Sequence, residues 1–220
     1  MAGAQAEAQR RPISARDTRW AAACARWLTR SGATPNGISV TSVGFGVLAG
    51  AAFWGTSQTD GLMRALLFVG AAAGIQARLL CNLFDGMVAV EGGLRTKSGE
   101  IFNELPDRFA DWAVFLGAGY AVGSGPHGVA LGWACALLAI LTAYVRALGA
   151  SAKASQHFEG PMAKQHRMAV MTAAAVVMAG TGIAGLHWPV MTWALWIVAL
   201  GSALTVVRRT RAIIRELEAR

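Results

Sequence analysis

The chain has few charged residues for its length. Only 15% of its 220 residues are Asp, Glu, Lys or Arg, whereas 55% are hydrophobic. The mean hydropathy is +0.43. A soluble domain of this length is usually more polar, so the composition argues against that class. It favours a protein with much of its surface in lipid.

Cysteine is also scarce. The three cysteines, Cys24, Cys81 and Cys135, are scattered and odd in number, and no two have the spacing of a metal-binding motif. They are therefore expected to be reduced thiols that pack as small apolar side chains. A signal peptide is not expected, because the N-terminus lacks an apolar core before the first long apolar segment.

The apolar residues form six long segments, each close to the roughly 20 residues that a bilayer span needs. They cover about 36–56, 65–90, 100–123, 128–150, 167–185 and 188–208, by that length rule. The sequence thus predicts an all-α membrane protein with six transmembrane helices. Residues 1–14 are expected to be disordered, and 15–220 to form a single membrane domain without a soluble part.

Acidic residues are outnumbered by basic ones, 12 to 20, which gives a formal charge of +8. The basic residues cluster before the first segment and after the second, fourth and sixth: Arg10, Arg11, Arg16, Arg19, Arg26 and Arg30; Arg95 and Lys97; Lys153, Lys164 and Arg167; Arg208, Arg209, Arg211, Arg215 and Arg220. The other three connections lack Lys and Arg, although Arg64 lies just inside the second segment. This alternation predicts a multi-pass protein of the cytoplasmic (inner) membrane with both termini in the cytoplasm. The same alternation argues against a nucleic-acid partner. The basic residues are expected to have a second role, which is to bind anionic lipids or substrate phosphates.

A short amphipathic segment precedes the first span. Between about Arg16 and Arg30, one face carries Trp20 and Trp27 and the others carry arginines. This pattern predicts an interfacial helix that lies flat on the cytoplasmic membrane surface. A soluble helix packed on another subunit is the alternative.

Two polar runs stand at the ends of the second and third segments. In the first, Asn82, Asp85 and Ala89 share one helical face, at positions i, i+3 and i+7. In the second, a stripe at every fourth residue consists of Gly99, Asn103, Asp107 and Asp111. Carboxylates at the end of a membrane helix are costly and therefore functional candidates. One tight reversal would bring the faces together as a cluster of hard oxygen ligands suited to a divalent metal and a diphosphate.

The spacing of these runs resembles that of a known family. The chain reads N-x-x-D-G-x-x-A-V, eight residues, then G-x-x-x-N-x-x-x-D, from Asn82 to Asp107. The CDP-alcohol phosphatidyltransferases have D-x-x-D-G-x-x-A-R, eight residues, then G-x-x-x-D-x-x-x-D. Every spacing agrees, and the identities agree at five positions: Asp85, Gly86, Ala89, Gly99 and Asp107. The family also has six spans after a surface helix.

The resemblance implies a reaction and its machinery. The family transfers the phosphoalcohol part of a CDP-linked lipid donor to an acceptor hydroxyl and releases CMP, with Mg²⁺ or Mn²⁺ at the four acidic positions. By position, Asp107 would be the general base. The metal ligands would be Asn82, Asp85, Asn103 and Asp107, with Asp111 one turn further along the same face. The donor would lie against Gly86, Ala89 and Gly99. A homodimer in the membrane is also implied.

The chain departs from the signature at three positions. Asn82 and Asn103 replace aspartates, and Val90 replaces the arginine. An asparagine can offer a carbonyl oxygen to a hard cation but no charge, so a two-metal site loses two negative charges. Asp111 and, from another angle, Glu104 are the nearby acids that would compensate.

Four basic residues in or near the spans are candidates for anion binding. Lys164 and Arg167 open the fifth segment one turn apart, and Arg146 lies near the inner end of the fourth. These three are assigned to a polar or phosphorylated alcohol acceptor, although basic residues also flank spans for topological reasons alone. Arg78 has the same claim, or pairs with an acidic residue of the motif.

The sequence leaves two functions open. The retained Asp85 and Asp107 favour an active transferase of phospholipid biosynthesis, since the chemistry depends most on its base. The two asparagines leave room for a degenerate relative that binds CDP-lipid or nucleotide without turnover. A transporter has only the spans in its favour. The sequence does not distinguish inositol phosphate, glycerol phosphate, serine or a second lipid as acceptor.

Overall fold

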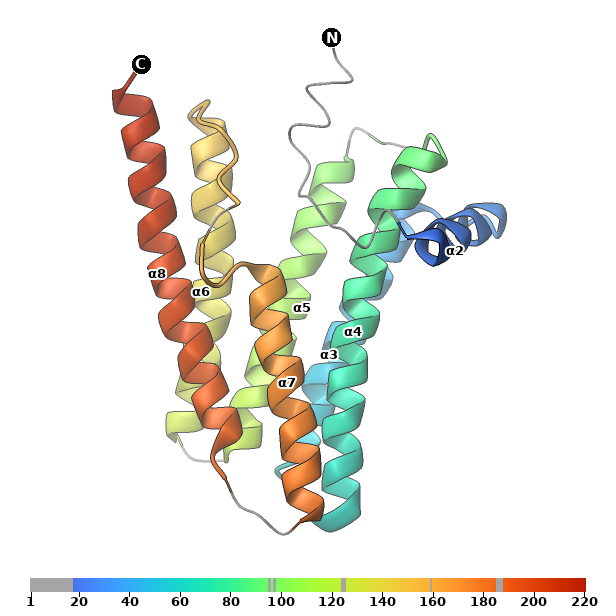
Figure 1. Ribbon diagram of the computed structural model, residues 1–220, viewed down its shortest axis with the longest axis vertical. Coiled ribbons are helices and arrows are strands. Elements are labelled where there is room, and N and C mark those ends of the chain that lie inside the picture. The colour runs from blue at the N-terminus through green and yellow to red at the C-terminus, as the bar shows by residue number, and fades with distance from the viewer. Residues whose placement is uncertain (1–17, 95, 97, 124–125, 159, 185–187) are drawn as a thin grey trace.

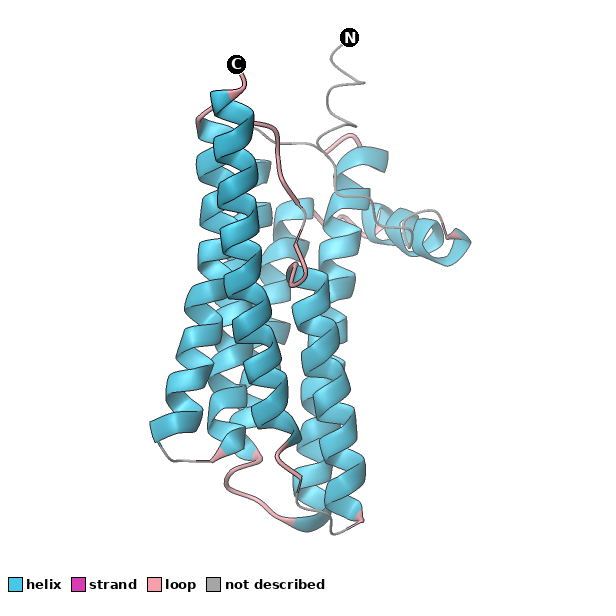
Figure 2. Cartoon of the chain, turned by 60° about the vertical axis from the view of Figure 1, so that its left-hand side comes forward, coloured by secondary structure: helices cyan, strands magenta, loops and turns pink. Residues whose placement is uncertain are grey.

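The chain folds into a bundle of long helices. The computed structural model describes residues 18–94, 96, 98–123, 126–158, 160–184 and 188–220, and within these ranges it contains seven helices and no strand (Figures 1 and 2). They are α2 (Arg19–Arg30), α3 (Pro35–Gly55), α4 (Gly61–Glu91), α5 (Gly99–Val122), α6 (Pro126–Ser151), α7 (Lys164–Ile183) and α8 (Val190–Glu218). The expected disordered segment, 1–14, lies outside the described residues.

Most of these helices are suited to a bilayer. Five are long and apolar enough to cross a membrane, namely α3, α4, α6, α7 and α8. The sixth long helix, α5, falls outside this group and carries Glu100, Glu104, Asp107, Arg108 and Asp111 along its sequence. The protein is thus an all-helical, multi-pass membrane protein.

The helix bounds agree with the predicted segments except at the C-terminus. There α8 continues to Glu218, well past the end expected near 208. Its extension packs beside α6, since the Ile213 side chain lies against Gly149. Glu216 accepts hydrogen bonds from the backbone and side chain of Ser155, at 2.9 and 2.7 Å. These contacts continue the helix through a stretch whose basic residues indicated only the end of a span.

Glycines set the spacing of the bundle. A Cβ on Gly117 of α5 would collide with the backbone of Gly50 of α3, and a Cβ on Gly119 of α5 would lie 3.0 Å from the Cα of Gly132 of α6. Small residues allow this approach, and without a hydrophobic driving force in lipid the close packing itself holds the helices together. These contacts fix α5 between α3 and α6, which places Asp107, Arg108 and Asp111 inside the bundle.

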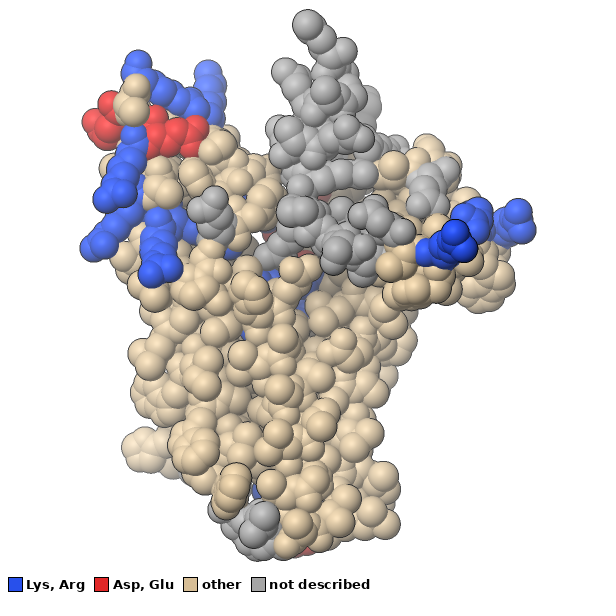
Figure 3. Space-filling model, viewed as in Figure 1, with Lys and Arg blue, Asp and Glu red and all other residues tan. Residues whose placement is uncertain are grey.

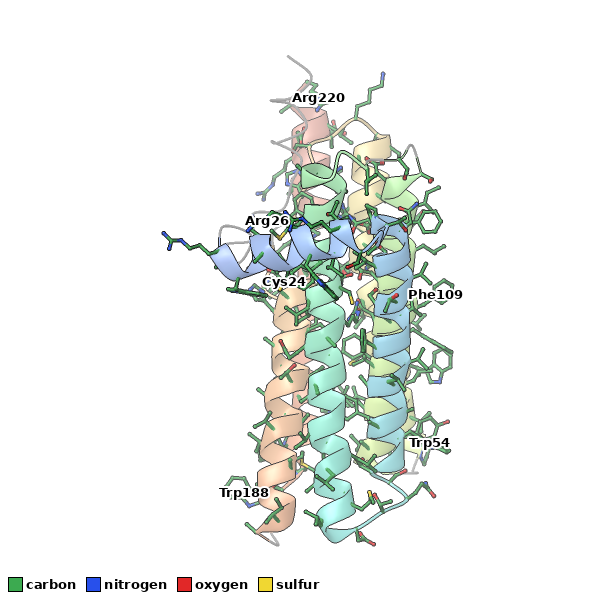
Figure 4. The ribbon with its side chains drawn as sticks, turned by 90° about the vertical axis from the view of Figure 1, so that its right-hand side faces the viewer. Cys24, Arg26, Trp54, Phe109, Trp188 and Arg220 are labelled. Atoms are coloured by element: carbon green, nitrogen blue, oxygen red, sulfur yellow. The ribbon has the colours of Figure 1, made fainter. Side chains whose placement is uncertain are left out.

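Helix α2 lies across the bundle instead of along it (Figure 4). Ala21 and Ala25 are fully buried in a cluster with Leu83 and Met87 of α4. Trp27 is 67% exposed on another face, and the Trp20 ring meets Phe84 edge-on, with centroids 6.1 Å apart. The alanines therefore contact the protein, and most of the tryptophan surface stays outside it.

Candidate active site

The polar residues of the two sequence runs meet near the end of the bundle where α8 ends. Here α4 supplies Asn82 and Asp85, α5 supplies Asp107 and Asp111, and the first turn of α7 supplies Lys164. Figure 3 shows that, on the face in view, Lys and Arg gather over this end of the molecule, while most of the described surface below it is uncharged. The connection between α4 and α5 is short enough to bring the two motif halves to the same level, as the spacing predicted.

Asp107 is surrounded by hydrogen-bond donors. Its Oδ1 accepts a hydrogen bond of 3.1 Å from the Asn82 amide and forms an ion pair with the Lys164 ammonium. Arg78 lies 3.4 Å from the same oxygen, and Arg108 lies 3.7 Å from Oδ2. Asp107 is only 6% exposed, so these cations offset the cost of burying its charge.

Asp85 has fewer polar contacts than Asp107. Ser39 of α3 donates a hydrogen bond of 2.7 Å to its Oδ2, and the carboxylate is 5% exposed. Lys164 and Asp107 lie within electrostatic reach. Among the described residues Asp85 forms no ion pair within 4 Å, unlike Glu104, Asp107 and Asp111, so its carboxylate is open to an added cation.

Asp111 belongs to a buried ion network. Its Oδ1 lies 2.6 Å from Arg78, and its Oδ2 lies 3.2 Å from Arg167. All three side chains are at most 1% exposed. Arg167 also donates hydrogen bonds to Thr142 and to the Met162 carbonyl, at 3.1 and 3.0 Å. Both oxygens of Asp111 are thus engaged by guanidinium groups, and Arg78 pairs with acidic residues, one of the two roles considered for it.

A second, more exposed network lies beside the first. Glu104 forms ion pairs with Arg146 of α6 and, at 3.6 Å, with Arg108. Arg146 also donates a hydrogen bond of 3.1 Å to Gln156 and stacks on Phe158, 5.1 Å from the ring centre. Because the Glu104 side chain is 43% exposed, this network stays accessible from outside.

The remaining predicted residues line the two helix ends. Gly86 and Ala89 are partly exposed on α4, and Gly99 is the first residue of α5. Asn103 is exposed, and among the described residues no hydrogen bond to its side chain is formed. A ligand at this end would reach Asn103 without displacing a protein contact.

Sequence reasoning missed two residues that contact the acids. Ser39 lies in the first span and no motif includes it, and Arg108 directly follows Asp107. The only signal for Arg108 was a basic residue beside an acidic one in an apolar segment. Ser39 gave no signal, because a serine in a membrane helix commonly bonds its own backbone, as Ser39 also does to the Pro35 carbonyl.

The charges in the two networks nearly cancel. Four carboxylates, from Asp85, Glu104, Asp107 and Asp111, face five cationic groups from Arg78, Arg108, Arg146, Lys164 and Arg167. In the described part of the chain, no group of three or more His, Cys, Asp or Glu side chains is placed to hold a metal ion. Two carboxylates, from Asp85 and Asp107, and the amide group of Asn82 lie in this region, and oxygen ligands of this kind suit one hard divalent cation. They do not supply the charge for two.

Comparison with known proteins identifies relatives. No family model matches the chain. It is 28% identical over 190 residues to the phosphatidylinositol phosphate synthase of Mycobacteroides abscessus, covering 84% of this chain and 80% of the relative. It is 29% identical over 210 residues to that of Streptomyces avermitilis, covering 87% and 77%.

Solved structures show the same fold. The phosphatidylinositol phosphate synthase of Mycobacterium tuberculosis with CDP-DAG bound has a TM-score of 0.75 to this chain at 21% identity, covering 89% of this chain and 94% of that one. The same enzyme in complex with manganese and citrate has a TM-score of 0.74 at 21% identity, covering 88% of both chains. In sequence and in fold this chain is thus similar to phosphatidylinositol phosphate synthases, and its spaced motif from Asn82 to Asp107 resembles the signature of the CDP-alcohol phosphatidyltransferases.

Proposed function

We propose that the protein transfers a phosphatidyl group from CDP-diacylglycerol to the hydroxyl of a phosphorylated polyol, releasing CMP. One observation carries this proposal: Asp107, the last aspartate of the motif, contacts Asn82 of α4 and Lys164 of α7 at one point. A carboxylate that can take a proton thus lies beside a cation that can hold a phosphate. The relatives support the donor and acceptor classes, since they are named phosphatidylinositol phosphate synthases and one is solved with CDP-DAG bound.

Asp107 acts as the general base in this proposal. It removes the proton of the acceptor hydroxyl, and the resulting oxygen attacks the donor phosphorus that carries the diacylglycerol. A new P–O bond to the acceptor forms, the P–O bond to the CMP phosphate breaks, and CMP leaves with the bonding electrons. The proton on Asp107 passes to solvent or to the departing phosphate.

Asp85, Asp107 and the oxygens of Asn82 and Asn103 would hold Mg²⁺ or Mn²⁺ in this scheme. A bound divalent cation would neutralise diphosphate charge and stabilise the leaving CMP. Asp111 is not assigned to the metal, because it lies one turn deeper than Asp107 and pairs there with two arginines that are, like Asp111 itself, at most 1% exposed. It positions these arginines instead.

The ligands divide between the two motif halves and the basic residues. The nucleotide can approach the backbone closely where side chains are small or absent, at Gly86, Ala89 and Gly99. Lys164 and Arg146 bind the acceptor phosphate. Arg167 supports them from behind, because it is buried and its guanidinium group already bonds Asp111, Thr142 and the Met162 carbonyl.

The same proposal includes six spans, with α5 as the third. It has 24 residues, which corresponds to about 36 Å of helix, enough to cross the hydrocarbon core. Three of its five charged residues are paired inside the bundle: Asp107, Arg108 and Asp111. The crowding of Lys and Arg at one end supports a cytoplasmic location for that end and for both termini, in the inner membrane (Figure 3).

Helix α2 would lie in the cytoplasmic interface of that membrane. Trp27 and half of Trp20 are exposed, and Arg26 lies on the exposed surface of the helix (Figure 4). Tryptophan and arginine together suit the headgroup region. We also propose that residues 15–220 form one domain and that the protein is a homodimer, as the family resemblance implies. Cross-linking in native membranes tests the dimer.

The test is CMP release by the purified protein with CDP-diacylglycerol, Mg²⁺ or Mn²⁺, and inositol phosphate, glycerol phosphate or serine as acceptor. Wild type should release CMP only when an acceptor is present, and Asp107→Ala should abolish release. Asp60→Asn, at the opposite end of α4, is the matched control and should keep full activity.

Intact turnover by Asp107→Ala would overturn the assignment of the base. No CMP from wild type with any acceptor, together with metal-dependent binding of CDP-diacylglycerol, would instead favour the degenerate binding protein that Asn82 and Asn103 suggest.

A further inference from the structure

A polar pair lies on the lipid-facing side of the bundle, away from the charged networks. The Gln76 amide of α4 donates a hydrogen bond of 2.8 Å to the Thr172 hydroxyl of α7. Gln76 is exposed, and both residues lie inside helices apolar enough to span the membrane. The pair therefore bridges the seam between α4 and α7 on the surface that meets lipid.

This position is unfavourable unless the pair has a further partner. One hydrogen bond uses one of the two N–H groups of Gln76 and one lone pair of Thr172. Within the described residues, neither side chain makes another hydrogen bond, so one amide N–H and the hydroxyl proton remain as donors. An unsatisfied polar group in hydrocarbon is costly. The Gln76 carbonyl oxygen is free as well, but the two free donors need an acceptor, which lipid can supply.

The pair also lies deeper along the helices than the charged residues of the site. Gln76 precedes Asn82 by six residues on α4, about 9 Å along the helix. Thr172 follows Lys164 by eight residues on α7, about 12 Å. Both helices thus lead from the charged end of the site to the pair. Helix α2 crosses α4 (Figure 4) and contacts it at Leu83 and Met87, which lie on the Asn82 side of Gln76.

A diacylglycerol lipid places its acceptors in the same order. Its phosphate belongs with the cations of the site, and the ester carbonyls of its glycerol follow a few bonds deeper, at the top of the acyl chains. Ester carbonyls accept hydrogen bonds and cannot donate them, which matches the two free donors of the pair.

We propose that Gln76 and Thr172 bind the glycerol ester carbonyls of the lipid donor and so select diacyl donors over dialkyl ether donors. This inference rests on the proposed function for the identity of the donor, but it concerns binding and not turnover. The competing explanation is that the pair only holds α4 against α7, as polar side chains do between membrane helices.

The experiment measures dissociation constants for CDP-diacylglycerol and for CDP-dialkylglycerol with matched chain lengths, using the purified protein in lipid nanodiscs. Wild type should bind the ester about 25-fold more tightly, the value of two hydrogen bonds near 1 kcal/mol each. Gln76→Leu and Thr172→Val should each weaken ester binding about fivefold, the double variant should bind ester and ether alike, and none of them should change ether binding. Thr181→Val is the control on the same helix, because that hydroxyl bonds the Val177 carbonyl of its own helix at 3.0 Å.

An ester-to-ether ratio near one in wild type would overturn the proposal, as would equal weakening of both lipids by Gln76→Leu. Since binding is measured without turnover, these results stay separate from the fate of the proposed function. If the protein binds both lipids but releases no CMP, the proposed transferase function is refuted, and the ratio of the two dissociation constants still tests the role of Gln76 and Thr172.

Discussion

Removing the charge of Asp111 tests the interpretation of the buried network most directly. In Asp111→Asn, Arg167 would keep only its bonds to Thr142 and Met162. Arg78 would keep its more distant contacts with Asp107 and its bond to the Met168 sulfur. Breaking a buried ion pair from one side typically costs about 3–5 kcal/mol, because the partner charge stays buried without compensation. Two guanidinium groups share Asp111, so the loss should reach the upper part of that range.

The assay is equilibrium unfolding in mixed micelles with a chelator present, so that metal binding does not contribute. Glu104→Gln is the matched control, since it removes a carboxylate from the same helix that also pairs with two arginines. That carboxylate is 43% exposed, and exposed pairs contribute only about 0–1 kcal/mol. Both variants remove a carboxylate that pairs with two arginines, so the ratio of their losses in free energy of unfolding reflects the burial of the ion pairs and not their number.

The result also separates the two roles considered for Asp111. If it positions arginines, Asp111→Asn destabilises the protein equally with and without Mn²⁺. If it binds metal, the metal-free stability of the variant matches wild type and only the stabilisation by Mn²⁺ is lost. The second pattern would refute the positioning role of Asp111.

Two further predictions concern packing and charge. Gly117→Ala should lower the free energy of unfolding by about 1–3 kcal/mol or more, because the new Cβ would meet the backbone of Gly50. Gly70 faces open space, so Gly70→Ala should leave the free energy of unfolding unchanged. Equal effects of the two variants in the same unfolding assay would contradict the role of close helix approach. In Asn82→Asp, the new carboxylate would lose the hydrogen bond to Asp107 and repel that residue. The variant should therefore be less stable than wild type in chelator and bind Mn²⁺ about tenfold more tightly, as measured by calorimetry. An unchanged affinity for Mn²⁺ would exclude Asn82 from the cation site.

Much of the architecture could be predicted from the sequence, because a segment that crosses the bilayer as a helix must be apolar and about 20 residues long. Six apolar segments of span length and alternating basic connections predicted the order and bounds of α3 to α7 within a few residues. The C-terminal end of α8 could not be read in this way. Basic residues mark where a span leaves the bilayer, but a helix can continue in water when it finds partners such as Gly149 and Ser155.

The site was predictable in its position and less so in its pairing. Spacing alone brought Asn82 and Asp107 together, because residues on one face of each helix must meet when the connection is short. Spacing does not decide which acid pairs with which base. Asp111 shares the face of Asp107, yet it lies one turn deeper, where Arg78 and Arg167 reach it.

The charge count links the two asparagines to the basic residues. With aspartates at both positions, the site would hold six carboxylates against five cations, and two divalent metals would find anionic ligands. With Asn82 and Asn103, four carboxylates face five cations before any ligand binds. The diphosphate of a CDP-lipid would then meet positive charge from the protein itself, chiefly from Lys164. We therefore expect one divalent cation, held by Asp85 and Asp107, to suffice, since the ammonium beside Asp107 supplies part of the charge that a second metal would bring.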